Sequence, residues 1–152
     1  MFLFAILIFQ ANRIETLPPA VLQLKELKLL LLSANPLIHQ SKDVQVNIHS
    51  LEENSEIVQP DSPVPLSFDL PSLKELCCRV ISSDNSFNQL IHVLPVDVKA
   101  YLHSGTNCDM CGRLFFKHWL EVIRNCSEWE SDPPLIPIRY QICSLRCARR
   151  IH

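Results

Sequence analysis

Two closely spaced pairs of cysteines near the C-terminus constrain the fold of this chain more than any other feature. Cys108 and Cys111 form the first pair, directly before Gly112, and 31 residues separate them from the second pair, Cys143 and Cys147. Each pair can supply two thiolates from one turn, and the spacer is long enough for the chain to fold back. Four thiolates in a tetrahedron are typical ligands of structural Zn²⁺. The sequence therefore predicts a structural zinc centre held by Cys108, Cys111, Cys143 and Cys147.

The cysteine count favours metal ligands over disulfides. The chain has seven cysteines, whereas a disulfide framework in a secreted protein usually has an even number. Pairs of the form C-x2-C in an intracellular protein more often bind metal. The first nine residues are all apolar, but they carry no basic flank and fall short of the ~20 residues that span a bilayer. We therefore expect an intracellular, cytoplasmic protein with no membrane partner; a signal or anchor role for Met1–Phe9 is the alternative.

The residues between the cysteine pairs predict a small β-rich module. Aromatic and β-branched residues suggest a strand pair formed by 113–116 with 119–123, and a polar loop follows at 125–134. Residues 135–140 suggest a strand at a sheet edge, because Pro137 has no N–H to donate to a neighbouring strand. A knuckle, a hairpin and then ligands at the start of a helix is the order of treble-clef zinc folds, which this segment resembles.

Other residues near the cysteine pairs are weaker candidates for metal ligands or catalysis. A lone histidine is more often a surface or packing residue than a ligand, which ranks His103, His118 and His152 below the four cysteines. Cys126 has no serine, cysteine or histidine constellation at a recognisable spacing around it. Four thiolates also leave no open coordination position for water. We therefore expect no catalytic residue, no enzymatic activity and no small-molecule substrate.

The N-terminal part has an internal period of 23 residues. In both copies, alternating apolar residues precede an asparagine, Asn12 or Asn35, and an L-P-x-x-L segment beginning at Leu17 lies between them. This pattern is typical of leucine-rich repeats, in which apolar side chains of a short strand point inward and the asparagine bonds backbone groups at the corner. A leucine-rich helix over 22–32 is the alternative, but it does not explain the matched asparagines. The matched apolar positions are Phe4, Leu7, Phe9 and Ile14 in the first copy and Leu27, Leu30, Leu32 and Leu37 in the second.

Two repeats are fewer than such a fold usually needs. Each repeat buries its apolar face only against its neighbours, so three or more are generally required for stability. We therefore expect an exposed apolar edge and a shortened form of a longer repeat protein.

The middle of the chain predicts a linker followed by two helices. Ser72 and Glu75 have the spacing of a capping box, in which each side chain bonds the other residue's backbone N–H. Leucine, cysteine, valine and isoleucine residues then fall on one face at helical spacing, and a second helix is expected over 94–102. We expect the two helices to cap the apolar end of the repeats. The apolar positions of the first helix are Leu73, Leu76, Cys77, Val80 and Ile81.

These features together resemble the animal leucine-rich-repeat-containing proteins. The resemblance rests on the repeat, the segment 94–105 and the terminal C-x2-C-G…C-S-x2-C pattern, and it covers residues 1–37 and about 70–150. It implies a curved solenoid used for protein interaction, and no catalytic residues. The fold expected is α/β with a small zinc module, in four segments: a truncated leucine-rich-repeat solenoid fragment (1–38), a polar linker (39–69), a helical cap (70–105) and a treble-clef-like zinc-binding unit with four cysteine ligands (106–152).

The sequence therefore predicts a non-enzymatic interaction or adaptor protein with an unknown protein partner. Nucleic acid is not an expected partner, because the net charge is −2 and the residues from Cys108 onward include seven Lys and Arg against five Asp and Glu. Two alternatives remain. One is a zinc module that recruits a ubiquitin-transfer enzyme, and the other is a secreted or membrane-anchored repeat protein. The sequence Asn125-Cys126-Ser127 would be a glycosylation acceptor only in the secreted case.

Overall fold

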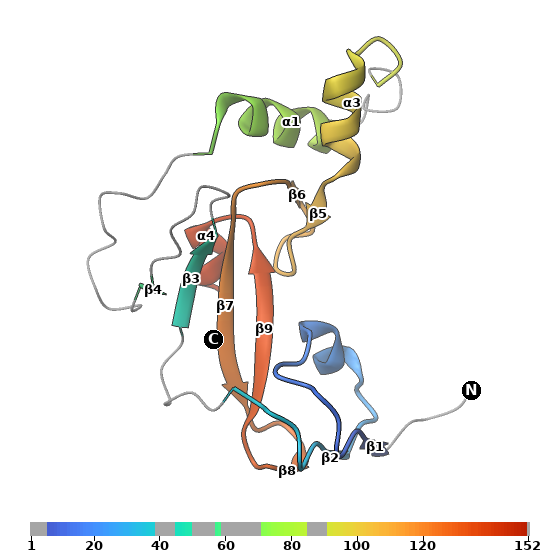
Figure 1. Ribbon diagram of the computed structural model, residues 1–152, viewed down its shortest axis with the longest axis vertical. Coiled ribbons are helices and arrows are strands. Elements are labelled where there is room, and N and C mark those ends of the chain that lie inside the picture. The colour runs from blue at the N-terminus through green and yellow to red at the C-terminus, as the bar shows by residue number, and fades with distance from the viewer. Residues whose placement is uncertain (1–5, 39–44, 50–56, 59–70, 85–90, 152) are drawn as a thin grey trace. The chain divides into compact units, whose positions relative to one another are not determined.

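The chain has a mixed α/β fold, as expected. A computed structural model describes residues 6–38, 45–49, 57–58, 71–84 and 91–151 (Figure 1). Two compact units are present, and each combines two separated segments: residues 1–45 with 123–140, and residues 46–122 with 141–152. The sequence predicted four consecutive segments, whereas each of these units joins two separated ones. The boundaries of the four segments stay a prediction. Most of the predicted linker, 39–69, lies outside the described residues.

The first unit contains three parallel strands that pair in register. β1 (Ile6–Ile8) pairs with β2 (Leu29–Leu31), and each residue of β1 faces the residue 23 positions later. A short 3-10 helix, η1 (Pro19–Gln23), lies between them in the sequence. β8 (Glu130–Asp132) pairs with the other edge of β2 (Figure 1). A polar segment near the C-terminus thus supplies the third strand beside the two repeats.

The loops that follow β1 and β2 have the same backbone shape. Ala11 and Ala34, which are 23 residues apart, both have left-handed backbone, with φ of 53° and 59°. Each comes directly before the asparagine of its repeat. The Asn35 side chain accepts a hydrogen bond from the N–H of Ile14 at 3.0 Å and donates to the carbonyls of Phe9 at 2.7 Å and Leu32 at 2.8 Å. Asn35 therefore joins the two turns, as the repeat pattern predicted.

Replacing Asn35 by alanine should destabilise the first unit by about 2 to 3 kcal/mol, because three hydrogen bonds at the two turns are lost. Asn12→Ala is the matched control. The Asn12 amide donates only to nearby carbonyls, those of Phe9 and Gln10, so its loss should cost about 1 kcal/mol or less. Urea unfolding of both variants measures the difference. Equal costs would contradict the bridging role of Asn35.

Apolar side chains from both segments form the core of the first unit. Leu30, Leu32 and Ile136 are fully buried, and Ile138 is 1% exposed. Leu17 forms a parallel bridge with Ile138 in β9 (Ile136–Ile142), donating its N–H to the Pro137 carbonyl and accepting from the Arg139 N–H. The first strand is more open, with Ile6 and Ile8 over half exposed, as expected of an apolar edge.

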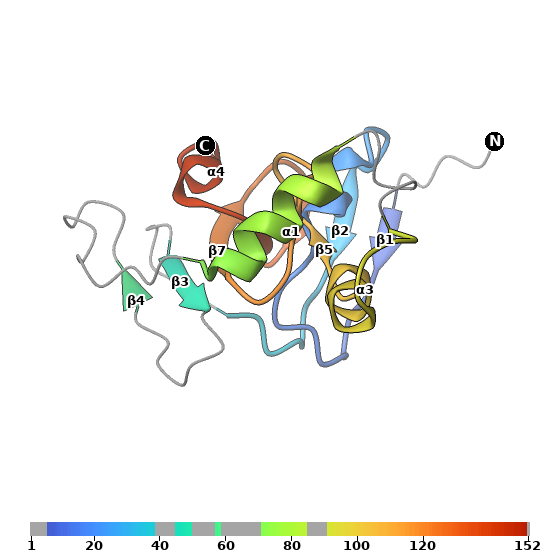
Figure 2. The same cartoon turned by 90° about the horizontal axis from the view of Figure 1, so that it is seen from above.

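The second unit contains helices, a short hairpin and much of a four-stranded sheet. The strand order of the sheet is β4-β3-β7-β9, so β9 lies at its edge as Pro137 predicted. β7 and β9 also contribute residues to the first unit. Helices α1 and α3 contact each other, and Figure 2 shows them from above. The elements are β3 (Gln45–His49), β4 (Ile57–Val58), α1 (Leu73–Ser83), α3 (Val96–His103), β5 (Thr106–Asn107), β6 (Leu114–Phe115), β7 (Trp119–Cys126) and α4 (Leu145–Ala148).

The strand pairing near the first cysteine pair differs from the prediction. β6 pairs with β5, not with β7, and this antiparallel hairpin encloses the loop that carries Cys108 and Cys111. β7 lies between β3 and β9 instead. The predicted loop at 125–134 was also wrong in part, because β7 continues to Cys126 and 130–132 form β8. These strands are set by long-range pairing, which local composition does not encode.

Helix α1 does not bury the apolar face that its sequence pattern predicted. Ser72 caps it as predicted, accepting from the Glu75 N–H at 3.2 Å. Glu75 does not complete the capping box, because its carboxylate is buried and bonds other parts of the fold. Of the five apolar positions predicted to share a face, only Ile81 is partly buried. In the part of the chain that the structure describes, no helix is long and apolar enough to cross a membrane.

Candidate metal centre

The four predicted cysteines lie together in the second unit. Their sulfur atoms all lie within 4.8 Å of one another. Cys143 Sγ is 3.6 Å from Cys111 Sγ and 3.7 Å from Cys147 Sγ. These distances are far longer than a disulfide bond of ~2.05 Å. The arrangement can hold one metal ion with four thiolate ligands.

The first pair lies on a tight knuckle between β5 and β6. The Cys108 N–H donates to the Arg113 carbonyl at 2.9 Å, and the Gly112 N–H donates to the Cys108 carbonyl at 2.9 Å. Gly112 has a φ of 72°, in the left-handed region that residues with a Cβ rarely adopt. Gly112 therefore lets the turn close so that Cys108 and Cys111 present their thiols on the same side.

The second pair spans the end of β9 and the start of α4. Cys143 directly follows β9, and Cys147 lies within α4. Two links join this segment to the knuckle. The Cys143 N–H donates to Cys108 Sγ at 3.4 Å, and Asp109 and Gln141 exchange hydrogen bonds, with the Asp109 N–H donating to the Gln141 carbonyl and the Gln141 N–H donating to the Asp109 carboxylate. These hydrogen bonds join the two segments that carry the cysteine pairs.

The pKa values of Cys111, Cys143 and Cys147 are shifted in different directions. Burial is the largest cause for Cys143 and Cys147, and it raises both pKa values, that of Cys143 to about 12. Burial also acts to raise the pKa of Cys111, but hydrogen bonds from the Arg113 backbone and from the other three thiols outweigh it and lower that pKa. Crowded buried thiols resist losing several protons at once. A cation at the centre of the cluster would remove that resistance, because it stabilises the thiolates.

The weaker candidates do not join the cluster among the residues that the structure describes. His103 ends α3, and His118 is buried just before β7. Cys126 ends β7, where burial raises the pKa of its thiol. Cys77 and Cys78 lie on α1. His152 lies outside the described residues.

A buried network that the sequence did not indicate supports the centre from α1. The Glu75 carboxylate accepts hydrogen bonds from the backbone N–H groups of 116, 117 and 118, at 3.0 to 3.3 Å, and from the Tyr101 hydroxyl. Arg79 pairs with Glu75 and also donates to the Cys143 carbonyl at 2.9 Å. Arg79 therefore connects α1 to the segment that carries the second cysteine pair.

The network also affects Tyr101. Burial and the Glu75 carboxylate raise the pKa of Tyr101 to about 12, so its hydroxyl stays protonated and able to donate at neutral pH. The only sequence signal for this network was the Ser72–Glu75 spacing, which indicated a different role for Glu75.

The chain combines a mixed α/β fold, two repeat-like parallel strands and a cluster of four cysteines that could hold a metal ion. Comparison with known proteins supports a relationship to leucine-rich repeat proteins. Leucine-rich repeat-containing protein 63 of Rattus norvegicus is 26% identical over 102 residues, which are 67% of this chain. The matched stretch spans only 16% of the rat protein. No family model and no solved structure match the chain.

Proposed function

We propose that this chain is a non-enzymatic protein-interaction module in which one structural Zn²⁺ holds the second unit together. The observation that carries the proposal is the spacing of the thiols. In a tetrahedron with Zn–S bonds of about 2.3 Å, neighbouring sulfurs are about 3.8 Å apart. The sulfur distances from Cys143 to Cys111 and to Cys147 are 3.6 and 3.7 Å. These two distances match a zinc tetrahedron, and all four sulfurs lie within 4.8 Å of one another, so that zinc would draw the more distant ones closer.

The donor set favours a structural over a catalytic metal. Four thiolates fill the tetrahedral coordination of zinc and leave no position for a reactive water. Soft thiolates also select zinc over magnesium or calcium, which prefer oxygen ligands. The metal would join the knuckle, the end of β9 and α4, and through Arg79 would fix α1. Binding to another protein is the role supported by the similarity to a leucine-rich repeat protein.

Metal analysis of the purified full chain tests the zinc assignment. We expect about one zinc per chain, measured by plasma mass spectrometry, because the cluster has one set of four ligands. Cys108→Ser and Cys143→Ser should each lose most of the metal. Even the mutation of a residue that only hydrogen-bonds a ligand typically lowers metal affinity about 10- to 100-fold, and these variants remove a ligand itself.

Cys126→Ser and Cys77→Ser are the matched controls, because both remove a thiol outside the cluster. They should keep the full zinc content. Zinc that is absent from the wild type, or unchanged in both cluster variants, would contradict the proposal. A treble-clef topology and a cytoplasmic location stay predictions, and so does a particular resemblance to leucine-rich repeat-containing protein 28.

A further inference from the structure

Two of the four cysteines in the cluster can be reached from solvent, and the other two are enclosed. Cys111 is exposed, whereas Cys108 and Cys147 are buried, at 2% and 5% exposure. Cys143 is partly exposed and lines a pocket with a volume of about 230 Å³ beside α1. Oxidation of cysteine depends on such access. A small oxidant can therefore reach Cys111 and Cys143 while the fold is intact.

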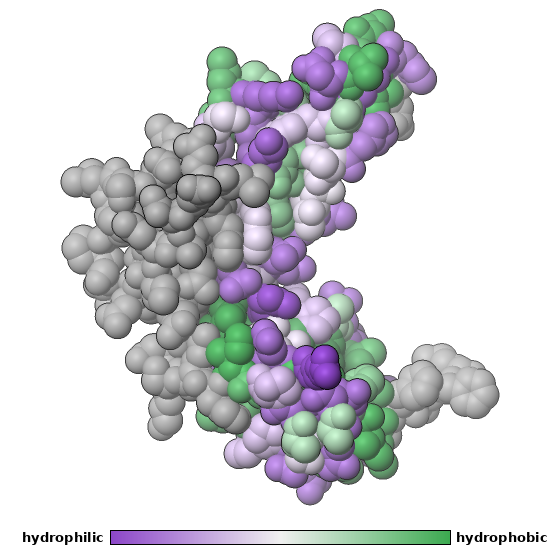
Figure 3. Space-filling view, viewed as in Figure 1, coloured by the Kyte–Doolittle hydropathy of each residue, from purple (hydrophilic) through white to green (hydrophobic). Residues whose placement is uncertain are grey.

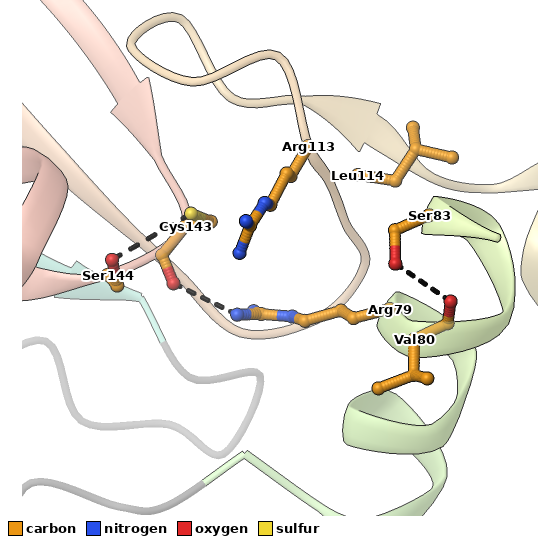
Figure 4. A pocket seen from close by; sticks show the side chains of 7 residues that line it. All are labelled: Arg79, Val80, Ser83, Arg113, Leu114, Cys143 and Ser144. Atoms are coloured by element: carbon orange, nitrogen blue, oxygen red, sulfur yellow. Dashed lines mark hydrogen bonds between the residues drawn. The ribbon is translucent and has the colours of Figure 1, made fainter.

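The two accessible cysteines are also close neighbours. Their Sγ atoms are 3.6 Å apart, so an approach of about 1.5 Å would give the S–S length of a disulfide. Figure 4 shows the Cys143 side chain at the wall of the pocket, where the open space leaves room for this movement. The hydrogen bonds between Asp109 and Gln141 hold the two segments next to each other. A disulfide between Cys111 and Cys143 thus fits the cluster.

The surroundings of Cys143 favour its reactive form. The thiolate is the nucleophile in cysteine chemistry, and neighbouring positive charge stabilises it. Figure 4 shows the Arg113 side chain extending into the pocket beside Cys143 and Arg79, and Arg79 donates to the Cys143 carbonyl. Thiols that bind zinc have already lost their protons. The zinc-loaded cluster therefore needs no change of protonation before it reacts.

From these features we infer that hydrogen peroxide converts Cys111 and Cys143 to a disulfide and thereby releases the zinc. The Cys111 thiolate attacks one oxygen of the peroxide, the O–O bond breaks, hydroxide leaves, and Cys111 becomes a sulfenic acid. The Cys143 thiolate then attacks the Cys111 sulfur. The S–S bond forms, the S–O bond breaks and a second hydroxide leaves. The two thiolates lose two electrons in total, and the peroxide gains them.

The disulfide would change what holds the second unit together. Only Cys108 and Cys147 would remain as thiolates, and two ligands do not complete the tetrahedral site of structural zinc. Since Cys111 belongs to the first pair and Cys143 to the second, the new bond would still join the knuckle to the end of β9. This inference rests on the zinc assignment and specifies how that centre is regulated.

Peroxide treatment of the full zinc-loaded chain tests the inference. A colorimetric chelator measures free zinc, and alkylation followed by mass spectrometry measures the loss of free thiols. We expect about one zinc to be released for each disulfide that forms, because one disulfide removes two of the four ligands. A phosphine reductant followed by zinc should restore the starting zinc content.

The sequence allows the disulfide to be assigned by digestion. Trypsin cuts after Arg146 and so separates the two cysteines of the second pair, and a protease that cuts before Asp109 separates those of the first pair. Mass spectrometry of the doubly digested, oxidised chain should then show one linked peptide pair that joins Cys111 to Cys143.

Cys77 provides the matched control for exposure. It is also exposed, and it lies on α1, over which hydrophobic surface is visible in Figure 3. The adjacent Cys78 is buried in a core cluster, and neighbouring side chains on a helix point about 100° apart. Cys77 should therefore stop at a sulfenic acid that dimedone labels, whereas Cys111 should proceed to the disulfide. Cys77→Ser should release zinc at the wild-type rate.

Several outcomes would overturn the inference. These are a disulfide within either cysteine pair, a disulfide that leaves zinc bound, and a sulfinic acid at Cys111 without any disulfide. A zinc-loaded cluster that stays reduced at peroxide concentrations that oxidise Cys77 would overturn it as well. In each of these cases the zinc assignment would stand. A purified chain without zinc would contradict the assignment itself, so the two failures are distinguishable.

Discussion

Removal of the metal should unfold the second unit. Structural zinc contributes about 10 to 16 kcal/mol in small zinc peptides, whereas a whole domain is usually stable by only about 5 to 15 kcal/mol. The metal term is therefore as large as the total stability, and the metal-free unit should lose its fixed structure. Hydrogen exchange after treatment with an excess of EDTA should show protection lost in 71–84, 91–122 and 141–151.

The response should depend on the cluster and not on cysteines in general. Cys126→Ser should behave like the wild type both before and after chelation, because Cys126 lies outside the cluster. Adding back zinc should restore protection in both proteins. Full protection in a sample shown by mass spectrometry to hold no metal would contradict a structural role for the centre.

Loss of the Glu75 carboxylate should be the most damaging single change outside the cluster. Glu75 is 1% exposed, and removing it leaves Arg79 and three backbone N–H groups without their acceptor. Breaking a buried charge pair from one side typically costs about 3 to 5 kcal/mol. We therefore expect Glu75→Ala to lower the free energy of unfolding in urea by about that amount, with zinc bound.

An exposed ion pair in the same helices provides the comparison. The Nζ atom of Lys74 lies 3.8 Å from Oδ2 of Asp97, and the two side chains are 47% and 74% exposed. Solvent screening limits such pairs to less than about 1 kcal/mol, so Asp97→Ala should have little effect. A double-mutant cycle of Glu75→Ala with Arg79→Ala should show strong coupling. Similar costs for Glu75→Ala and Asp97→Ala would show that the buried network is not important for stability.

The four-cysteine cluster could be predicted from sequence because metal ligands carry their chemistry in local spacing. One reversal of the chain after Gly112 is enough to bring the pair 108/111 next to the pair 143/147. The asparagine at position 35 was also predictable, since its match with Asn12 indicated a repeated turn. In both cases the residue type itself restricts the backbone or the ligand.

The third parallel strand was not predictable, for the opposite reason. Glu130, Ser131 and Asp132 have neither alternating hydrophobicity nor high strand propensity, and they form β8 through backbone hydrogen bonds with β2. Helix α1 was misjudged because periodicity shows which residues share a face but not whether that face is buried. Glu75 and its backbone donors determined the orientation, and those donors are about 40 residues away in the sequence.

The pairing of β2 with β8 also has a consequence for folding during synthesis. Leu29–Leu31 leave the ribosome well before Glu130–Asp132, and at ordinary rates of translation the delay is about 5 to 20 s. During this time the edge of β2 that β8 will occupy has no native partner. Contacts between distant segments also slow folding in general. The nascent strands β1 and β2 would therefore benefit from a chaperone that shields them until Glu130–Asp132 emerge.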